Sequence, residues 1–268
     1  RSRGLGDVYK RQVKTLQQLP GVAVGTEGMT GLYVRGGGAD ENLYLLDGNP
    51  VYHVNHLLGF FSAFNPDAIK NTRFYKGSFP AEYGGRLSSV VDVRMNDGNR
   101  QEYHGNISVG LLSARANLEG PIVKDRSSFN VSVRRTWLDL ITGTALAVVN
   151  KNSSIKDVFG YHFFDINAKL NHSFSDRSRA YLSFYMGQDA FRQGSKEKNG
   201  DSEDMFLWRW GNLIGSAGWN YVFGQKLFGN LMVGYSRFRS HIRQEVGGYE
   251  IYACLLYTSP SPRDRSVS

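Results

Sequence analysis

The chain has 268 residues, of which 41% are hydrophobic, 13% aromatic and 21% charged, with 31 glycines, 7 prolines and one cysteine. This composition supports a sizeable core and excludes an intrinsically disordered chain, a collagen, a coiled coil and a disulfide-stapled scaffold. The longest weakly polar run, Leu140–Val149, is about half the roughly 20 residues that a transmembrane helix needs. We therefore expect no membrane-spanning helix.

The two ends of the chain read as translations of opposite strands of one DNA element. A codon choice for Cys254–Asp264 gives a string whose reverse complement encodes Ser2–Arg11. Because that DNA resembles a sequencing-library adapter, we expect residues 1–12 and 254–268 to be non-native and set them aside. They carry half of the formal net charge of +8 and the only cysteine, Cys254. The rest of the chain gives little support to nucleic-acid binding and offers no thiol nucleophile or cysteine-ligated metal site.

Residues 13–99 contain many glycine turns between short apolar runs. Three of the runs, Gly31–Arg35, Leu43–Leu46 and Ser88–Arg94, predict short strands. Asn65–Lys70 combines an N-cap-type asparagine, a proline and helix formers, so it predicts one short helical turn. We therefore expect a small α+β domain over residues 13–99.

From about Tyr103 onward, apolar and polar residues alternate over long segments. In Phe164–Asn171 the apolar side chains fall on one face and the polar ones on the other, and Ala180–Met186 repeats the pattern. Period two over this length predicts strands with one apolar and one polar face. We expect about six such strands, at residues 104–118, 127–137, 162–173, 178–188, 208–223 and 226–241.

Strand length and connections favour a transmembrane β-barrel. Several strands reach the roughly 9–11 residues of a tilted membrane strand, whereas strands of soluble sheets are usually about 5–6 residues long. Tight turns at Asp176-Arg177 and Gly224-Gln225 alternate with long polar loops over Thr142–Tyr161 and Phe191–Phe206. Aromatic residues at strand ends are expected to form interfacial girdles: Trp137, Tyr161, Phe163, Phe191, Trp208, Trp210, Tyr221 and Phe223. The competing interpretation is a soluble β-sandwich or calycin-like barrel, whose strands also alternate.

No arrangement of residues makes a positive case for an enzyme. Gly36–Gly38 follows a predicted strand, but neither a dinucleotide fingerprint nor a P-loop surrounds it. His53 and His56 have no third metal ligand nearby, and we find neither a serine–histidine–aspartate arrangement nor a Gly-x-Ser-x-Gly elbow. We therefore predict no catalytic residue, no metal and no cofactor.

Arg35 and Arg86 each stand beside glycines at a strand end. Both can be ordinary surface cations. Alternatively, their planar guanidinium groups pair with carboxylates in a confined lumen and latch one domain to another. A modest force or a competing ligand breaks such a latch, as a gate requires.

Four ordered motifs carry a family resemblance: Gly31-Leu-Tyr-Val-Arg-Gly-Gly-Gly38, Leu43-Tyr-Leu-Leu-Asp-Gly-Asn-Pro-Val51, Ala68-Ile-Lys-Asn-Thr-Arg-Phe-Tyr-Lys-Gly77, and Ala81-Glu-Tyr-Gly-Gly-Arg86 with Val90-Val-Asp-Val93. Their order resembles the plug domain of TonB-dependent outer-membrane receptors. Downstream, Leu118–Asp125 and Val133–Asp139 are similar to the first barrel strands of such receptors from Bacteroidetes-type bacteria. The resemblance covers most of Leu16–Arg239.

The resemblance implies a plug domain at residues 13–99 and, at residues 100–253, the first part of a barrel of roughly 22 strands. It implies a plug–barrel lock formed by Arg35, Gly36 and Arg86. The plug-motif residues it implies are Asp47, Gly48, Pro50, Gly77, Tyr83, Gly84 and Gly85. Ligand-facing plug loops are expected at Ala39–Asn42 and Val51–Phe64, with the candidates Asp40, Glu41, Asn42, His53, Asn55, His56, Phe60 and Phe61.

The function implied by the resemblance is energised import of a scarce nutrient across the bacterial outer membrane. The cargo classes it leaves open are a siderophore, a cobalamin-like compound, an oligosaccharide and a peptide. The implied partners are a TonB-type energy-coupling protein, outer-membrane lipid and a surface lipoprotein, and no nucleic acid. We expect the coupling segment, a signal peptide and most barrel strands to lie outside this fragment. The alternatives are a soluble β-rich adhesin or carbohydrate-binding module and an outer-membrane hydrolase.

Overall fold

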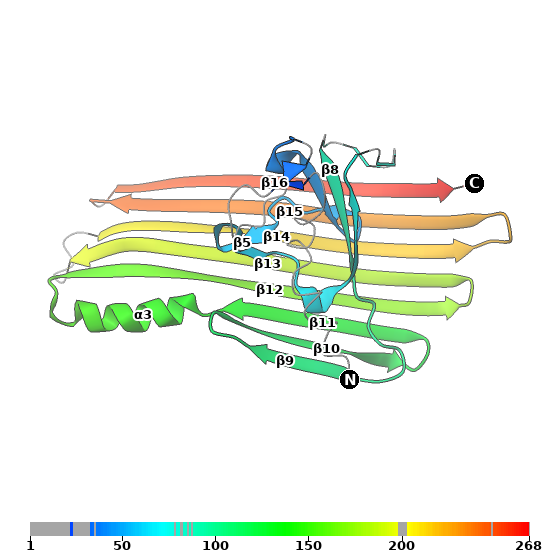
Figure 1. Cartoon of the computed structure of the whole chain (residues 1–268), viewed down its shortest axis with the longest axis horizontal. Helices are drawn as coiled ribbons and strands as arrows, with labels where there is room; N and C mark the ends of the chain where they lie inside the picture. The colour runs from blue at the N-terminus through cyan, green and yellow to red at the C-terminus, as the bar shows by residue number, and fades with distance from the viewer. Residues whose placement is uncertain are drawn as a thin grey trace.

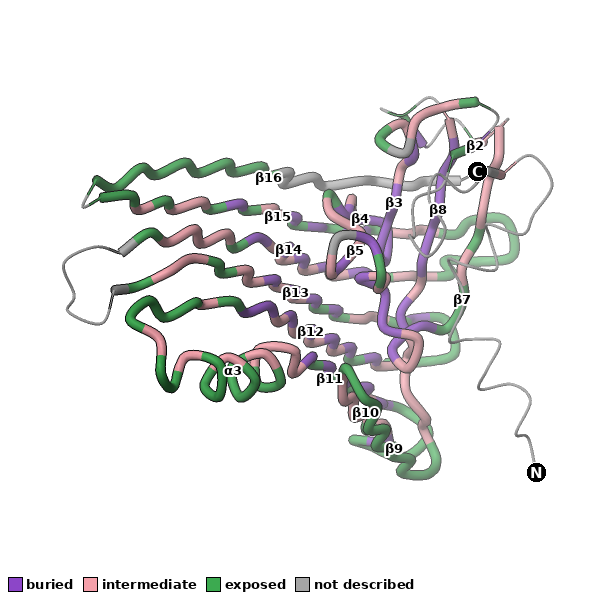
Figure 2. The backbone as a smooth tube through the Cα atoms, turned by 60° about the vertical axis from the view of Figure 1, so that its left-hand side comes forward, coloured by how far each residue is buried: buried purple, intermediate pink, exposed green. Residues whose placement is uncertain are grey.

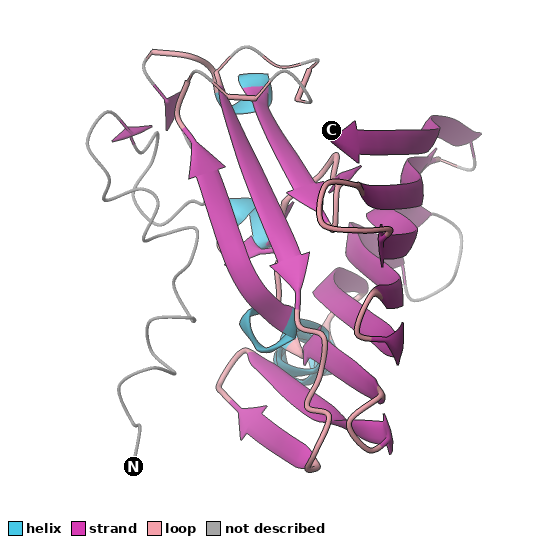
Figure 3. Ribbon diagram, turned by 90° about the vertical axis from the view of Figure 1, so that its right-hand side faces the viewer, coloured by secondary structure: helices cyan, strands magenta, loops and turns pink. Residues whose placement is uncertain are grey.

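The computed structural model describes residues 22–23, 33–34, 36–77, 79–80, 83–84, 86, 88–197, 203–247 and 249–267. A small mixed sheet built from the first part of the chain stands across one face of a large antiparallel sheet built from the rest (Figure 1). Figure 3 shows the same two layers from the side. We call the described residues from Val22 to Met95 the N-terminal domain.

The N-terminal domain is a four-stranded sheet with short attached elements. Its strands lie in the order β4-β3-β8-β7, where β3 and β8 are parallel and the other neighbours antiparallel. Its elements are β1 (Val22–Ala23), β2 (Tyr33–Val34), η1 (Ala39–Glu41), β3 (Asn42–Leu46), β4 (Asn49–Pro50), β5 (Asn55–His56), η2 (Leu57–Gly59), β6 (Phe61–Ser62), η3 (Pro66–Ala68), β7 (Ile69–Tyr75) and β8 (Ser89–Met95).

Local sequence explains two of these elements. The helical turn expected over Asn65–Lys70 is the 3₁₀ helix η3, and Asn65 caps it by accepting the backbone N–H of Asp67 at 3.2 Å. Asp47 and Gly48 join β3 to β4 with φ values of 46° and 84°. Consecutive left-handed residues are what a tight type I′ hairpin turn requires, and Asp-Gly is a preferred pair there.

The large sheet is an antiparallel meander in which every strand pairs with its sequence neighbours. Its strands are β9 (His104–Val109), β10 (Ser113–Val123), β11 (Ser127–Thr136), β12 (Ile155–Ser175), β13 (Ser178–Glu197), β14 (Glu203–Val222), β15 (Phe228–Val246) and β16 (Tyr249–Val267). Helix α3 (Leu138–Val149) and the 3₁₀ helix η4 (Asn150–Asn152) join β11 to β12. The expected fold class, a small mixed domain followed by antiparallel barrel-type strands, is confirmed.

The expected count of about six strands was too low, because the large sheet has eight. Residues 104–118 form two strands rather than one, since the chain turns between Val109 and Ser113. The last strand, β16, runs through residues 254–267, which we had set aside as non-native. An open sheet edge offers unpaired backbone groups to any extended segment, so this pairing does not depend on side chains.

Two predicted loops were also wrong. Residues 191–206 were expected to be a long polar loop, but β13 continues to Glu197 and β14 begins at Glu203. Apolar and polar residues no longer alternate at the adjoining ends of β13 and β14, although both strands continue. This is expected where both faces of a strand meet water. The loop expected over residues 142–161 contains most of α3 and the start of β12. Among the helices of the described ranges, none combines the length and the apolar character that a bilayer crossing requires.

The two faces of the large sheet differ in polarity and in what covers them. We call the face toward the N-terminal domain the inner face and the opposite face the outer face. Many inner-face residues of β11–β15 are buried under the domain, whereas outer-face residues are half-buried or exposed (Figure 2). On the outer face, Leu170, Leu182 and Phe184 are 45%, 57% and 39% exposed. A soluble sandwich would pack these side chains against a second sheet, and the described residues do not do so.

The expected aromatic girdle was partly wrong. Tyr161, Phe163 and Trp210 lie on the inner face and form a buried cluster with Leu57 and Phe61 of the N-terminal domain. Phe191 and Trp208 pack against the same cluster. These aromatic residues meet the N-terminal domain because their positions have the parity of the polar face.

Close approach of the two layers makes one glycine of β15 critical. A Cβ added at Gly234 would lie 1.5 Å from Oδ1 of Asn49, whereas a Cβ added at Gly215 of β14 meets nothing within 4 Å. We expect Gly234→Ala to displace the Asn49 amide and to destabilise the folded protein by about 1–3 kcal/mol. Thermal denaturation of the full-length protein in detergent checks this. Gly215→Ala is the matched control, and equal melting temperatures for the two variants would contradict the packing described.

Candidate functional site

The candidate site is the interface between the N-terminal domain and the inner face. Polar residues dominate the sheet side of this contact, and they are buried although their strands present apolar residues on the outer face. They include Ser128, Asn130, Ser132, Arg134, Asp165, Asn167, Lys169, Asn171, Asp189, Asn212, Ser216 and Ser236. Buried polar groups need partners, because an unpaired one costs about 1–3 kcal/mol. The N-terminal domain supplies many of those partners.

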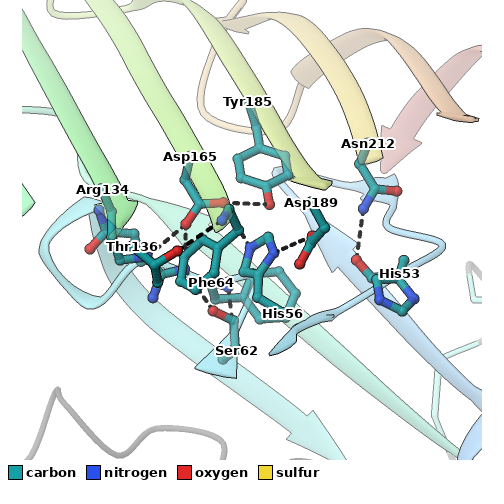
Figure 4. Close-up of polar contacts among 12 residues, drawn as sticks. His53, His56, Ser62, Phe64, Arg134, Thr136, Asp165, Tyr185, Asp189 and Asn212 are labelled. Carbon is teal, nitrogen blue, oxygen red and sulfur yellow. Dashed lines mark hydrogen bonds and ion pairs between the residues drawn. The ribbon is translucent and has the colours of Figure 1, made fainter. Parts of the chain in front are cut away.

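A charged cluster centres on His56, at the end of β5. The imidazole lies between two carboxylates of the sheet, with Nδ1 2.6 Å from Oδ2 of Asp189 and Nε2 2.8 Å from Oδ1 of Asp165 (Figure 4). The three side chains are 3% exposed or less. The His56 ring also stacks on Phe163, with centroids 4.2 Å apart and planes 6° apart. We call this set, with Arg134, the His56 cluster.

Arg134 of β11 connects the same cluster to the backbone of the N-terminal domain. Its Nε donates to Oδ2 of Asp165 at 2.7 Å, and a terminal guanidinium nitrogen donates to the carbonyl of Ser62 at 2.7 Å. Tyr161 donates its hydroxyl to Asp189 and accepts the backbone N–H of Leu57 at 2.5 Å. Polar groups of the two layers therefore form hydrogen bonds with one another across the interface.

The charges of the His56 cluster balance only when the imidazole is protonated. Burial by itself lowers the pKa of His56, but the nearby carboxylates of Asp165 and Asp189 outweigh burial and raise this pKa to about 9. The imidazolium and the Arg134 guanidinium then offset two carboxylates. His53, three residues earlier, behaves in the opposite way, because burial lowers its pKa. Of these two histidines, only His56 therefore carries a charge at neutral pH.

A second charged cluster lies around Lys169 of β12. Its ammonium is 3.3 Å from a carboxylate oxygen of Asp47, 3.1 Å from Oδ1 of Asp97 and 3.1 Å from the carbonyl of Met95. It also lies over the ring of Tyr181, 4.8 Å from the centroid. Burial raises the pKa of Asp97, but Lys169 and Lys70 outweigh it and hold this pKa below its usual value. Lys169 is therefore a buried cation paired with acids from the first part of the chain.

Neutral hydrogen bonds complete the interface. Asn212 donates to the carbonyl of His53 at 2.7 Å, and Ser236 donates to the carbonyl of Pro50 at 2.6 Å. Two further side-chain pairs bridge the layers, Asn49 with Ser216 and Asn65 with Ser132, the latter at 2.6 Å. Four strands of the sheet, β11, β12, β14 and β15, thus hold the N-terminal domain through side chains other than those of the His56 cluster.

The lock expected from Arg35, Gly36 and Arg86 is only partly visible. Arg35 lies outside the described residues. Gly36 adopts φ of 84° in a turn that Gly37 closes by donating to the carbonyl of Val34 at 3.0 Å. Arg86 is exposed rather than buried against the sheet. The role of this pair stays a prediction, and the charged contacts that the structure does show come from other residues.

The expected plug-motif residues have distinct structural places. Asp47 accepts the backbone N–H of Met95 at 3.1 Å besides pairing with Lys169. A Cβ at Gly48 would lie 2.7 Å from the sulfur of Met232, so this turn sits directly on β15. The carbonyl of Pro50 accepts a hydrogen bond from Ser236, and Tyr83 is buried against Leu45 and Val90. Gly77 has a φ of 155°, and Gly84 is exposed. Gly85 lies outside the described residues.

The expected ligand-facing residues divide into buried and accessible ones. Asn42 and His56 are buried, so neither faces open space; Asn42 accepts a hydrogen bond from Ser89 at 2.6 Å. Asp40 and Phe60 are exposed. Glu41, His53, Asn55 and Phe61 are half-buried, and Phe61 packs on Phe163 with centroids 5.5 Å apart. Within the described ranges, no three histidine, cysteine or acidic side chains gather as a metal site would require.

Sequence reasoning missed the sheet half of the interface. Arg134, Asp165, Lys169 and Asp189 were seen only as polar-face residues or not singled out. A signal was present, since full charges inside a membrane-type strand are costly and mark functional or paired positions. Four charges on the polar faces of three adjacent strands could therefore have predicted a charged partner that covers this face.

Comparison with known proteins finds a family model that is similar to the first part of the chain. Residues 10–91 match the family model described as the TonB-dependent Receptor Plug Domain. No curated protein matches the chain. Three solved structures are similar in fold: the siderophore receptor PirA from Acinetobacter baumannii (15% identity, TM-score 0.47, 90% of this chain and 48% of that one), a mutant of the ferric enterobactin receptor PfeA from Pseudomonas aeruginosa (15%, 0.46, 89% and 48%) and the outer membrane transporter YddB from Escherichia coli (10%, 0.44, 96% and 50%).

The chain therefore combines a plug-type mixed domain with an open antiparallel sheet. The N-terminal domain is similar to the TonB-dependent Receptor Plug Domain, whose family model matches residues 10–91. The chain spans about half the length of the solved receptors that it matches. From here on we call the N-terminal domain the plug.

The His56 cluster predicts that plug docking depends on pH. The pKa of His56 is about 9 in the folded protein, compared with an ordinary value of 6.5. Protonated His56 therefore stabilises the docked plug by about 3 kcal/mol. This stabilisation is complete below about pH 6.5 and is lost as the pH rises through about 9. We expect limited proteolysis of the plug in the full-length protein to accelerate across this window. His56→Gln should remove the pH dependence, and His53→Gln should keep it. A profile unchanged by His56→Gln would contradict the assignment.

Proposed function

We propose that this chain is the plug and first barrel portion of an outer-membrane receptor that imports a scarce nutrient when a TonB-type protein pulls on the plug. We keep residues 13–99 as the plug, residues 100–253 as the barrel portion, and residues 1–12 and 254–268 as non-native ends. One observation carries the proposal: the plug covers the polar face of the long strands, and their apolar face is left exposed. That is the polarity of a membrane barrel with a filled lumen.

The chemistry of the interface supports a plug that can be moved. A dry apolar contact would resist separation in proportion to its buried area. Here, hydrogen bonds and ion pairs hold the layers at the His56 cluster, at Lys169 and at Asn65. Water can replace these contacts when the layers separate, and a neutral hydrogen bond exchanged with water has a small net free energy of about 0.5–1.5 kcal/mol. The polar contacts thus position the plug specifically when the layers are together, and water can replace them when the layers separate.

The proposed cargo classes are a siderophore, a cobalamin-like compound, an oligosaccharide and a peptide. Phe60, which is exposed on the plug, suits stacking against a sugar or an apolar chelate. Asp40, in η1, is exposed as well. We also propose that Arg35 and Arg86 contribute to the lock, and that a surface lipoprotein assists capture. Uptake of each cargo class by cells carrying the full-length receptor tests import, which should cease when the energy-coupling protein is deleted.

The proposed membrane face can be mapped directly. We expect a photoactivatable lipid probe to label Leu170, Leu182 and Phe184 in the full-length protein embedded in vesicles, because these outer-face side chains are exposed. Ser183 and Tyr185, which alternate with them on the inner face and are buried, are the matched controls. Absence of label on the first set, or equal labelling of both sets, would show that the sheet does not face lipid.

The proposed movement can be blocked by a bridge across the interface. In a full-length receptor freed of other accessible cysteines, Asn65→Cys with Ser132→Cys places one thiol on the plug and one on β11, where the native side chains lie 2.6 Å apart. A short reagent with two methanethiosulfonate groups joins the thiols through disulfide bonds, and it should reduce uptake more than tenfold, as expected if the plug must leave the strand. Reduction should restore uptake.

The matched control bridges two residues of the plug itself. Asn42 and Ser89 are also hydrogen-bonded at 2.6 Å, so Asn42→Cys with Ser89→Cys tests the chemistry without joining the layers. Normal uptake with the Asn65–Ser132 bridge intact would rule out separation of the plug from this strand. Energised uptake by the unbridged protein tests import independently.

A further inference from the structure

A cationic hollow opens on the outer face, away from the plug. It has a volume of about 400 Å³ and lies over β13, β14 and β15. Three arginines line it, Arg209 of β14 with Arg237 and Arg239 of β15, together with Gln188 and His241. No acidic residue is among the described residues that line it. The hollow therefore gathers positive charge on a face that is otherwise apolar.

The strand register brings the three arginines close together. Gly211 lies opposite Arg239, and Arg209 lies opposite His241, so Arg209 and Arg239 are diagonal neighbours on one face. Such neighbours have Cα atoms about 7–8 Å apart, within reach of long side chains. Arg237 and Arg239 are two residues apart on the same strand and share that face. Three guanidinium groups can thus converge on one anion.

Among the described residues, these three arginines have no carboxylate partner, unlike Arg115, Arg134 and Arg135. Arg115 pairs with Asp67 at 3.0 Å and Arg135 pairs with Asp139 at 3.0 Å, while Arg134 pairs with Asp165. In the part of the chain that the structure describes, no ion pair forms at Arg209, Arg237 or Arg239. Like charges gathered this closely repel one another unless an anion joins them. The described residues thus leave these three guanidinium groups able to take an anion as counter-charge.

The position of the hollow along the strands points to the source of that anion. Below it, the outer face of β14 runs from Gly211 to Tyr221 through Leu213, Ala217 and Trp219. At about 3.3 Å per residue and a tilt near 40°, this stretch is about 25 Å tall, the height of the apolar band of an outer-membrane barrel. Arg209 and Arg239 therefore lie at the membrane–water boundary on the rim opposite the short turn at Arg177, and Arg237, opposite Leu213, lies just inside it.

We infer that Arg209, Arg237 and Arg239 bind the phosphate of a phosphorylated lipid headgroup at this boundary. Arginine forms paired hydrogen bonds to phosphate oxygens, and basic residues near a membrane surface attract anionic headgroups. The aliphatic stems of the arginines can lie along the apolar band while their charges reach the headgroup layer. The inference rests on the proposed function, because it requires the outer face to meet lipid.

Native mass spectrometry of the full-length protein in detergent tests the site. Phosphatidic acid, which carries a phosphomonoester, is titrated against phosphatidylcholine in mixed micelles. We expect preferential retention of phosphatidic acid, and a loss in apparent affinity on the order of thirtyfold for Arg237→Gln with Arg239→Gln. The matched control, Arg177→Gln with Arg179→Gln, removes two exposed arginines near the opposite rim and should change affinity less than twofold.

Several results would overturn the inference. Equal losses in the two double variants would show a general effect of charge, and equal retention of the two lipids would show no phosphate preference. Displacement of the lipid by millimolar inorganic phosphate would identify a site for the free anion instead. If the variant with Arg237→Gln and Arg239→Gln fails to fold, Arg209→Gln replaces it in the same experiment, and Arg177→Gln is then the matched control. Labelling of Leu182 by the lipid probe tests the membrane face separately. If Leu182 is labelled and phosphatidic acid is not retained, the phosphate site is wrong and the proposed membrane face is not.

Discussion

The burial of charge between two β layers is the constraint on which the rest of the structure depends. Asp165, Asp189 and Lys169 lie on strands of the large sheet and are almost wholly shielded from water. Removing one partner of such a pair leaves an uncompensated buried charge and costs about 3–5 kcal/mol. The plug must therefore present His56 and Asp47 at matching places. This requirement defines how the plug sits far more sharply than apolar packing would.

The same constraint explains why the interface differs from an ordinary protein core. An apolar core gains stability in proportion to the area it buries, with little regard to direction. Ion pairs and hydrogen bonds are directional, and they lose their stabilising effect once the partners move by a few ångströms. A plug held by Arg134, Asn65 and Lys169 is thus registered in one position and released over a short displacement. Specificity and reversibility come from the same contacts.

The sequence predicted the fold class and the polarity of the strands more completely than the site. Period two in Phe164–Asn171 correctly assigned alternate residues to two faces, because the pleat makes that a local property. The His56 cluster was out of reach, since it joins residues more than one hundred positions apart, and local patterns carry no information on which of them meet. Tyr161 and Trp210 were misassigned to a lipid girdle for the same reason: an aromatic residue at a strand end suits lipid and plug equally.

Strand β15 shows how closely the two faces are coupled. Ser236 binds the plug through the carbonyl of Pro50, and the next residue, Arg237, lines the cationic hollow on the opposite side. A slip of one residue in the pairing of β14 with β15 would exchange these faces, placing an arginine against the plug and a serine toward lipid. The buried contacts of Ser236 and the close approach at Gly234 oppose that slip. Plug docking thereby holds the outward charges at one level along the large sheet, so a single register determines the chemistry of both faces.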